Sequence, residues 1–536
     1  MKQLLTQAAV ADADAADSAP AMSTTALADA YMLANPAPGS VAAAVTNTGV
    51  GADGADAAQV QQALDESGLT DTGAGIKVGV LSDSFNDLGG AAADEADGAL
   101  PPASQIQVLS DLASGGTDEG RAMLQIIHDI APGASLAFAT ADGGEQSFAQ
   151  NILALAADGC KVICDDVSYF DEPFFQNGVV AQAIQTVEAE GVTFVTAAGN
   201  NASNAYQAAF TPIAGMFDGI NLHNAESFAG SLTQTVTVGG TAGESVPLLL
   251  EWNQAYGHAT SDLEMLVFQN GHLIGTSTNA SSGEPTNPWL EFDLTTPGTY
   301  QVAIENLSGP NPGLIKEIAA GDGLPVTISG ANTGSIFGHA ETPGAITAGA
   351  VDTADTPGFG VHPTNETFSS SGAGSELLFS NNGTALATPD LLSPVAASGV
   401  DNIHTSVSDL MDFFGTSAAS ASLAGVAALL LAEDPNLTPA QVDQIMQQTA
   451  VPTGNTAVGG AGLVQVDPAV AAAGQIAAAN HVAAAATSSA ATSQVASAAA
   501  ASHASTMATS AIESHVATAA VESHVPTMEY HHLWTT

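Results

Sequence analysis

One serine of the chain lies where a hydroxyl group could act as a nucleophile. Gly415 and Thr416 precede Ser417, and a run of small and apolar residues follows at once, which predicts a buried helix. The N-terminus of a helix offers free N–H groups and the positive end of the helix dipole. Both favour the oxyanion that forms when a serine attacks a carbonyl carbon. Taken alone, the same serine is more typical of an ordinary helix cap than of a nucleophile.

A second stretch, residues 115–134, places candidate proton acceptors at the start of another predicted helix. Glu119 and His128 can each accept a proton from a serine, whereas Arg121, the only arginine of the chain, keeps its own proton. If residues 119–128 form one helix, they turn it by about 900° and lift it by about 13 Å, so Glu119 and His128 face opposite ways. His128 therefore cannot replace Glu119 at the same site, and a buried structural role is favoured for it.

Apolar strands alternate with helices around both stretches. The strands are continuous apolar runs without a period of two, which indicates a parallel sheet covered by helices on both faces. Glycines after two of the helices supply the expected helix ends. We therefore predict an α/β fold with a mainly parallel sheet. The predicted strands of its first half are residues 76–83, 135–141, 161–169 and 192–200.

Short strands separated by Gly, Pro and Asn turns occupy residues 225–332. Tyr300, Val302 and Ile304 alternate with more polar residues, as in a half-buried strand, so we predict an inserted antiparallel β-sandwich. An Ala/Ser/Thr/His-rich end of the chain lacks the composition to bury a large core. The predicted domains are a flanking segment (1–70), the first part of the α/β domain (71–222), the sandwich (223–333), the second part (334–471) and a low-complexity tail (472–536).

The composition excludes several partners. Only 5 Lys and Arg residues oppose 55 Asp and Glu residues, for a formal charge of −50, so the chain cannot neutralise nucleic acid phosphates or an anionic membrane surface. A solubility role, or adaptation to salt or acid, explains the missing cations. No apolar run predicts a membrane span. Cys160 and Cys164 lie about 13 Å apart along a strand, too far for a disulfide.

Three motifs resemble those of the subtilisin-like serine peptidases. GTSAASASLAGVAALL, with Ser417, is similar to the helix that carries their nucleophile. VGVLSDSFN resembles the strand that ends in their catalytic aspartate, here Asp83, and VTFVTAAGNNA resembles the loop with their oxyanion-hole asparagine, here Asn200. The motifs follow in the family's order. The resemblance implies a subtilisin-like three-layer fold and a serine endopeptidase that hydrolyses peptide bonds through an acyl-enzyme on Ser417.

The sequence departs from this family at the general base. The family's His-Gly-Thr motif falls on Glu119-Gly120-Arg121, and sedolisins, relatives that act in acid, do place a glutamate there. Sedolisins usually have an aspartate one turn later, where Met123 stands, and an aspartate in place of Asn200. We therefore expect a non-standard Asp83–Glu119–Ser417 triad in which two carboxyl groups share a proton at acid pH.

Three neighbouring charged groups are candidates for supporting this triad. Arg121 occupies the position of the motif's threonine and could pair with Asp118 or keep a carboxylate ionised. Asp118 and the adjacent Asp165 and Asp166 could couple to the triad, with solvated carboxylates at a loop or strand end as the structural alternative.

The resemblance also sets expectations for partners and place of action. The substrate is a protein or peptide, no cofactor is required, and we expect a monomer that acts outside the cell or at its surface, although the N-terminus is a poor secretion signal. Calcium is common in this family, and the acidic loop 94–98 is compatible with it but lacks a ligand pattern. The rival hypothesis is a catalytically inactive peptidase homologue that acts as a binding or surface module, because the family's histidine is missing.

Overall fold

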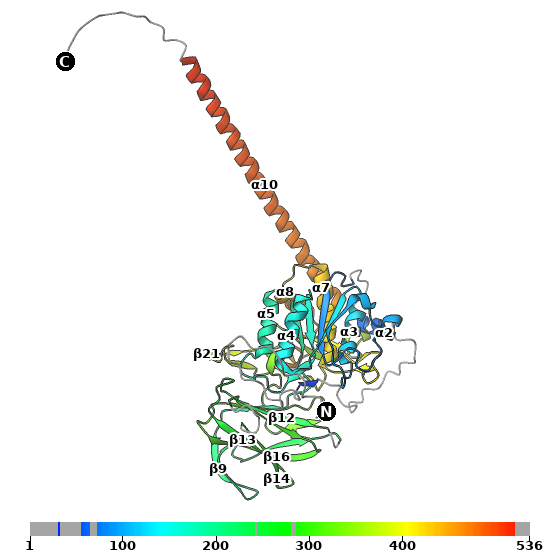
Figure 1. Cartoon of the computed structure of the whole chain (residues 1–536), viewed down its shortest axis with the longest axis vertical. Helices are drawn as coiled ribbons and strands as arrows, with labels where there is room; N and C mark the ends of the chain where they lie inside the picture. Colours follow the sequence, from blue (N-terminus) through cyan, green and yellow to red (C-terminus); the bar gives the residue numbers. More distant parts are fainter. Residues whose placement is uncertain (1–29, 33–54, 65–71, 242–243, 280–285, 520–536) are drawn as a thin grey trace, which may run out of the picture. The chain divides into compact units, whose positions relative to one another are not determined.

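Seven parallel strands form the central sheet of the computed structural model, which describes residues 30–32, 55–64, 72–241, 244–279 and 286–519 (Figure 1). Apart from the edge strand β3, the strand residues are almost all buried, as a parallel sheet covered by helices on both faces requires. The predicted α/β fold is therefore confirmed. In spatial order the strands are β22 (Val395–Asp401), β19 (Ile346–Asp352), β7 (Thr193–Ala197), β5 (Val162–Asp165), β2 (Lys77–Ser82), β4 (Ser135–Thr140) and β3 (Ile106–Ser110).

Two pairs of helices cover this sheet, one pair on each face (Figure 1). On one face α3 (Glu119–Ile130) packs against α7 (Thr416–Glu433), and on the other α4 (Gly144–Ala157) packs against α5 (Val179–Ala189). Gly425 keeps α7 close to α3, because a Cβ atom at this position would lie 2.9 Å from the Cβ atom of Ile130. By length and composition α7 could cross a membrane, but it is 89% buried inside the protein and is a core helix.

Shorter elements connect and flank the sheet. The capping box of α8 joins Thr438 and Gln441 through reciprocal side-chain to backbone hydrogen bonds. The remaining helices are α1 (Ala55–Ala63), α2 (Ala91–Asp97), α8 (Pro439–Thr449) and α9 (Thr456–Gly459), with 3₁₀ turns at Ala103–Gln105, Gly338–Glu341 and Pro357–Phe359. Small strand pairs are β1 (Ala30–Met32) with β6 (Val167–Tyr169), β20 (Glu376–Phe379) with β21 (Ala385–Leu391), and β23 (Ile403–His404) with β24 (Asp412–Phe413).

An antiparallel β-sandwich is inserted between β7 and β19, as the short strands of the sequence predict. Tyr300, Val302 and Ile304 of β16 all lie in its core, which confirms the predicted alternation. One sheet holds β9 (Pro212–Phe217), β10 (Ile220–Glu226), β11 (Gln234–Val238), β13 (Asp262–Gln269), β14 (His272–Thr278), β16 (Gly298–Ser308) and β18 (Val326–Ile328). The other holds β8 (Ala205–Ala208), β12 (Val246–Trp252), β15 (Trp289–Leu294) and β17 (Ile315–Ala319), so strand pairing begins before the predicted boundary at residue 223.

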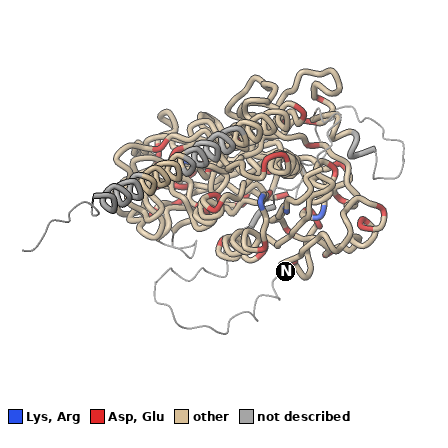
Figure 2. Tube along the Cα trace, turned by 90° about the horizontal axis from the view of Figure 1, so that it is seen from above, with Lys and Arg blue, Asp and Glu red and all other residues tan. Residues whose placement is uncertain are grey.

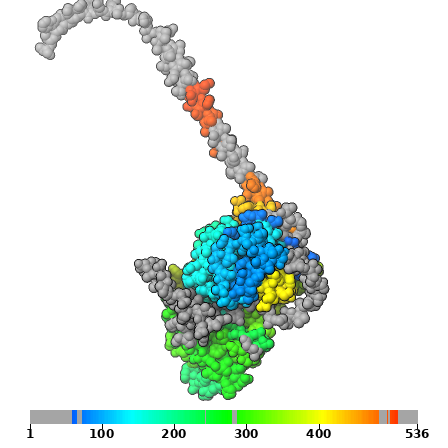
Figure 3. Space-filling view, turned by 45° about the vertical axis from the view of Figure 1, so that its right-hand side comes forward, coloured from blue at the N-terminus to red at the C-terminus, as the bar shows by residue number. Residues whose placement is uncertain are grey.

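The sandwich lies directly against the parallel-sheet core (Figure 3). Phe174 of the core joins Leu249 and Ile318 of the sandwich in one apolar cluster. Next to this cluster the buried Lys316 ammonium lies 3.7 Å from the Glu341 carboxylate and within cation–π distance of the Phe174 ring. The inserted sandwich is therefore joined to the core by a continuous interior rather than by a linker.

Each end of the chain is described only in part. Most of the predicted flanking segment 1–70 lies outside the described residues, which include β1 and α1 in this region. Contact density divides the chain into a unit up to Ala473 and a second unit from Gly474. The helix α10 (Val466–Ala519) covers the described part of the predicted low-complexity tail, and residues 520–536 lie outside the description.

Glu317 of β17 generates a prediction about stability and pH. Its side chain is fully buried, neither carboxyl oxygen has a hydrogen-bond partner, and burial raises its pKa from 4.5 to about 8. Below pH 4.5 both the folded and the unfolded chain hold this proton, so the ionisation of Glu317 does not lower the free energy of unfolding. As the pH rises through the folded pKa, stability on the order of a few kcal/mol is lost.

We therefore expect Glu317→Gln to unfold at a higher urea concentration than the wild type at about pH 8, and to differ little at about pH 5. The matched control is Glu190→Gln, which removes an exposed carboxylate. An equal response of both variants to pH would contradict the assignment of the buried charge.

Candidate active site

Ser417 lies in the first turn of α7, one position inside the helix. The helix begins at Thr416, and the cap residue is Gly415, with a φ of 108° that suits glycine and no side-chain cap hydrogen bond. The Gly415 N–H donates to the buried Asp401 carboxylate at 3.0 Å, which fixes the loop before the helix. The Ser417 side chain is 0% exposed. Because Gly415 caps the helix, Ser417 does not have the ordinary capping role.

Asn200 faces the same helix start from the loop after β7. Its Oδ1 atom accepts hydrogen bonds from the Thr416 N–H at 3.0 Å and the Thr416 hydroxyl at 3.1 Å. The Gly199 N–H donates to that hydroxyl at 3.0 Å, so the two loops hold each other. With Oδ1 fixed in this way, the Nδ2 amide group is the part of Asn200 that remains to act as donor.

The start of α3 is held by strained and closely packed backbone. Asp118 precedes the helix with a φ of 59°, a left-handed conformation that aspartate tolerates better than most residues. Gly120 leaves no room for a side chain, because a Cβ atom there would lie 2.2 Å from the Phe138 ring and 2.9 Å from the Ser84 carbonyl oxygen. The helix therefore begins against the sheet, and Glu119, which is 2% exposed, is buried beneath it.

Asp83 holds this helix start through backbone donors. Its carboxylate accepts hydrogen bonds from the Glu119 N–H at 3.0 Å and the Thr117 hydroxyl at 2.7 Å, and from the N–H groups of Thr117 and Ser84. We predicted that Asp83 is the partner of the Glu119 carboxyl group. The hydrogen bonds instead join Asp83 to the backbone of Glu119, and its charge reaches the Glu119 carboxyl group only through space.

The carboxyl partner of Glu119 is Asp166, which follows β5. The two side chains share a hydrogen bond, and the Ser417 hydroxyl group also hydrogen-bonds Glu119. Asp166 is 0% exposed and accepts from the Ser82 hydroxyl at 3.1 Å. Burial raises the pKa of both carboxyl groups, and the negative charge of Asp83 raises both further. The alternative of a solvated strand-end carboxylate is therefore wrong for Asp166.

Arg121 binds two other carboxylates. Its Nη2 atom lies 2.7 Å from Asp118 Oδ2 and its Nη1 atom lies 3.0 Å from Asp94 Oδ2, with all three side chains buried. The predicted pairing with Asp118 is therefore present. Asp118 also accepts hydrogen bonds from the Asp87 N–H and the Ser84 hydroxyl, so its carboxylate links the start of α3 to the loop after β2.

A model of the subtilase family matches residues 107–309 and 252–465 of the sequence, which is more than half of the chain. The chain belongs to the subtilase family. No curated protein matches its sequence. Similar solved structures include the CspB protease of Clostridium perfringens, at 13% identity, with 77% of this chain and 98% of that chain covered and a TM-score of 0.48. Fervidolysin from Fervidobacterium pennivorans is 14% identical, with 78% and 45% covered and a TM-score of 0.36.

His128 takes no part in the site of this subtilase. Burial lowers its pKa, no charged group of the site contributes to that shift, and its Nδ1 atom has no hydrogen-bond partner within the described structure. Glu119 and His128 do lie in one helix, as predicted, nine residues apart. The buried structural role expected for His128 agrees with these surroundings.

A buried histidine that the sequence analysis missed lies behind the site. His339 Nδ1 is 2.5 Å from Glu172 Oε1, and its Nε2 is 3.3 Å from Asp165 Oδ1. Burial lowers the pKa of His339, but the charges of Glu172 and Asp165 outweigh burial and raise it well above its usual value. The buried His339 imidazolium therefore contacts Asp165. The alternative of a solvated carboxylate is wrong for Asp165, as it is for Asp166.

The strand β6 follows Asp166 directly and is paired with a second strand. The described N-terminal residues of β1 pair with it antiparallel, with Met32 opposite Val167 and Ala30 opposite Tyr169. β1 therefore runs toward Asp166 in the direction of its own C-terminus. This pairing means that the edge accepts an extended peptide backbone.

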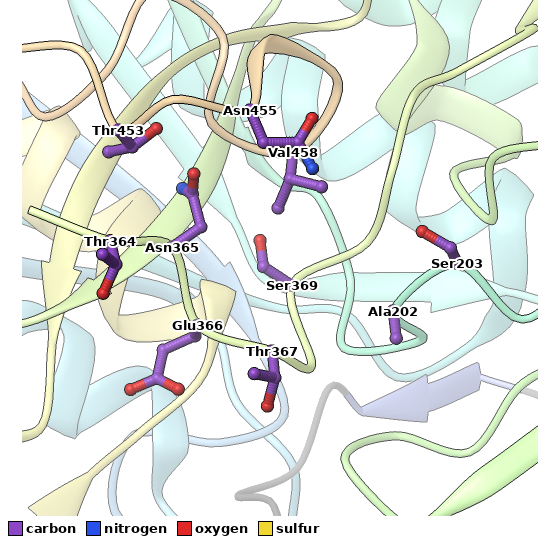
Figure 4. A pocket seen from close by; sticks show the side chains of 10 residues that line it. All are labelled: Ala202, Ser203, Thr364, Asn365, Glu366, Thr367, Ser369, Thr453, Asn455 and Val458. Carbon is purple, nitrogen blue, oxygen red and sulfur yellow. The ribbon is translucent and has the colours of Figure 1, made fainter.

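A cavity of about 520 Å³ borders the segment that follows Asn200 (Figure 4). Ala202 and Ser203 line it together with residues 364–367, and none of the candidate catalytic side chains does.

Within the described ranges, no group of three or more His, Cys, Asp or Glu residues is arranged to hold a metal ion. The segment 94–98, expected to be an acidic loop, instead lies in α2 as far as Asp97. The Asp94 carboxylate in it accepts hydrogen bonds from Arg121, Gln125 and Ser406.

The burial of Arg121 generates a stability prediction. Lys and Arg residues are sparse in the structure (Figure 2), and Arg121→Gln would leave two buried carboxylates without a cation. We expect a loss of about 3–5 kcal/mol in the free energy of unfolding. The control Lys77→Gln removes a half-exposed ion pair with Asp158 and should cost about 0–1 kcal/mol. Urea denaturation measures both, and equal losses would contradict the role of burial.

Proposed function

We propose that the chain is a serine endopeptidase with Ser417 as nucleophile, Glu119 as general base and Asp166 as the partner that shares a proton with Glu119. The observation that carries this proposal is the chain of hydrogen bonds from Ser417 to Glu119 and from Glu119 to Asp166, at the N-terminus of a buried helix. This refines the predicted Asp83–Glu119–Ser417 triad, since Asp83 acts on the backbone of Glu119.

The base works when the Glu119–Asp166 pair holds a single proton. Glu119 Oε1 and Asp166 Oδ1 are both buried without a hydrogen-bond partner, so the pair lacks donors and favours the retention of a proton. With this proton on Asp166, the ionised Glu119 can accept the Ser417 proton. Burial and mutual repulsion oppose the loss of the last proton, so the singly protonated pair persists above the usual pH range of a carboxyl group. The expected bias toward acid pH then takes the form of a fall in activity on the alkaline side, where this proton is lost.

The acyl-transfer steps follow from these positions. Ser417 Oγ attacks the peptide carbonyl carbon while its proton passes to Glu119, and the new oxyanion is stabilised by Asn200 Nδ2 and the Ser417 N–H. Glu119 then gives the proton to the leaving amine, and the acyl-enzyme forms. A water molecule then loses a proton to Glu119 and attacks the acyl carbon, and Glu119 returns that proton to Ser417 Oγ as the ester bond breaks and the carboxylic acid product leaves.

The substrate class is an extended segment of protein or peptide. The antiparallel pairing of β1 with β6 supports this, because it brings a backbone along the edge that ends at Asp166. Action outside the cell or at its surface, and the monomeric state, remain predictions. An inactive homologue is the rival function, and the hydrogen bond between Ser417 and Glu119 favours the enzyme over it.

The first test removes the nucleophile or the base. Ser417→Ala should abolish hydrolysis of an unstructured protein, and Glu119→Gln should lower kcat by about 10²–10⁴-fold. Ser422→Ala, in the same buried helix, is the matched control and should keep its activity. A serine-directed fluorophosphonate should label wild-type Ser417 stoichiometrically. Wild-type hydrolysis that survives Ser417→Ala would contradict the proposal, and a wild type without labelling or hydrolysis would support the inactive homologue.

The second test concerns the shared proton. The wild-type pH–rate profile should be bell-shaped, with the descending limb set by loss of the last proton of the pair. Asp166→Asn cannot lose that proton, so the variant should have a lower kcat and no descending limb. Asp142→Asn, which alters an exposed carboxylate beyond β4, should keep the wild-type profile. An unchanged descending limb in Asp166→Asn would exclude Asp166 as the partner.

A further inference from the structure

The loop between β17 and β18 of the inserted sandwich reaches the candidate active site. The Gly323 N–H donates to the Asn200 carbonyl oxygen at 2.8 Å, and the Asp322 N–H donates to Asn201 Oδ1 at 3.2 Å. On the same side, the Ala319 N–H donates to the Asn204 carbonyl oxygen at 2.9 Å. Residues 319–323 are thus hydrogen-bonded to residues 200–204, the loop that holds Asn200.

Within this loop the Asp322 carboxylate binds the group that should stabilise the oxyanion. Asn200 Nδ2 donates to Asp322 Oδ1 at 3.1 Å. Asp322 has a φ of 44°, in the left-handed region, and Gly323 follows it with a φ of 79°. The sandwich therefore presents an acceptor oxygen to the amide that the oxyanion of a substrate requires.

This contact is not needed to orient the amide of Asn200. Two hydrogen bonds from Thr416 already fix its Oδ1 atom. An ionised Asp322 next to Nδ2 opposes a second negative charge at the same place, because like charges in a partly buried site repel. Its charge is also felt at the Glu119 carboxyl group, which places it close to the proton acceptor as well. Finally, the Ser417 side chain is 0% exposed in the described form, so a substrate needs some part of the surroundings to move.

We propose that Asp322 is an internal, inhibitory ligand of the oxyanion site, and that the inserted sandwich controls the peptidase by placing or withdrawing this carboxylate. The inference rests on the proposed function of Ser417 and Asn200. It assigns the inserted sandwich a regulatory role. The contact between Asp322 and Asn200 is broken when the turn that follows β17 moves away from the Asn200 loop. Substrate or another ligand that displaces the loop would free Asn200 Nδ2.

The test compares two substitutions of Asp322 in the full chain. Asp322→Asn keeps the side chain's size and its tolerance of a positive φ but removes the charge, and Asp322→Gly removes the carboxyl group altogether. The matched control is Asp218→Gly, because Asp218 is an exposed sandwich residue with a φ of 48° that also precedes a glycine. Thermal unfolding of all variants checks that they fold as the wild type does.

The readout is the rate at which a small fluorophosphonate labels Ser417. This probe requires the nucleophile and the oxyanion site but no extended pairing with β6, so the β1–β6 contact does not limit it. We expect the labelling rate to rise about tenfold in Asp322→Gly, the value of one hydrogen bond to a charged group, with a smaller rise in Asp322→Asn. Asp218→Gly should label at the wild-type rate.

Two results would overturn the inhibitory role. A slower rate in both Asp322 variants would make Asp322 a support of the Asn200 amide, and a wild-type rate in both would leave it without effect on the site. Labelling of the wild type in either case leaves the proposed peptidase function intact. If Ser417 is labelled in neither the wild type nor the variants, the proposed function fails and the inhibitory role fails with it.

Discussion

A carboxyl group buried away from cations must either keep its proton or accept hydrogen bonds from N–H and O–H donors, and the site depends on this constraint. The carboxyl groups of the site meet this constraint in three different ways. Asp83 accepts hydrogen bonds from backbone donors, and Asp118 is paired with Arg121. Glu119 and Asp166 hydrogen-bond each other. Only the last arrangement requires a proton, so the candidate base is also the group whose charge responds to pH.

The same constraint explains where the few cations lie. Arg121 and Lys316 are both buried, each beside carboxylates, and the buried His339 is held between two more. Cations placed on the surface would contribute little there, because exposed ion pairs are screened by water and salt. Of the described cations, Arg121 and Lys316 are therefore the ones whose charges bear on the interior, whereas Lys77, which pairs with Asp158, and Lys161 lie at or near the surface.

The elements of the fold could be predicted because their signals are local. Apolar runs between glycines identify the parallel strands, and the residues from Gly415 onward identify α7 and its serine. The partner of Glu119 could not be found in this way, since Asp166 meets it only after two distant strands pair. A signal did exist, because parallel strands that end in Ser82 and Asp165 place the residues just beyond them at one edge of the sheet.

The sequence holds no such signal for the contacts that the inserted sandwich makes with the core. Asp322 stands in a turn whose sequence, Gly-Asp-Gly, is typical of any tight connection, and only the docking of β17 beside β8 brings it to Asn200. Sequence periodicity identifies a sandwich but not the face that it turns toward the core. The residues that connect separate domains are therefore the ones that sequence reasoning missed.

The start of α3 is held by contacts that do not involve the side chain of residue 119. Asp83 holds the peptide N–H of residue 119 rather than its side chain, and Gly120 sets the distance between α3 and the sheet. Neither contact depends on which side chain residue 119 carries. The backbone there accepts a glutamate, and its carboxyl group meets Asp166, which follows β5, whereas Asp83 contacts the backbone of residue 119.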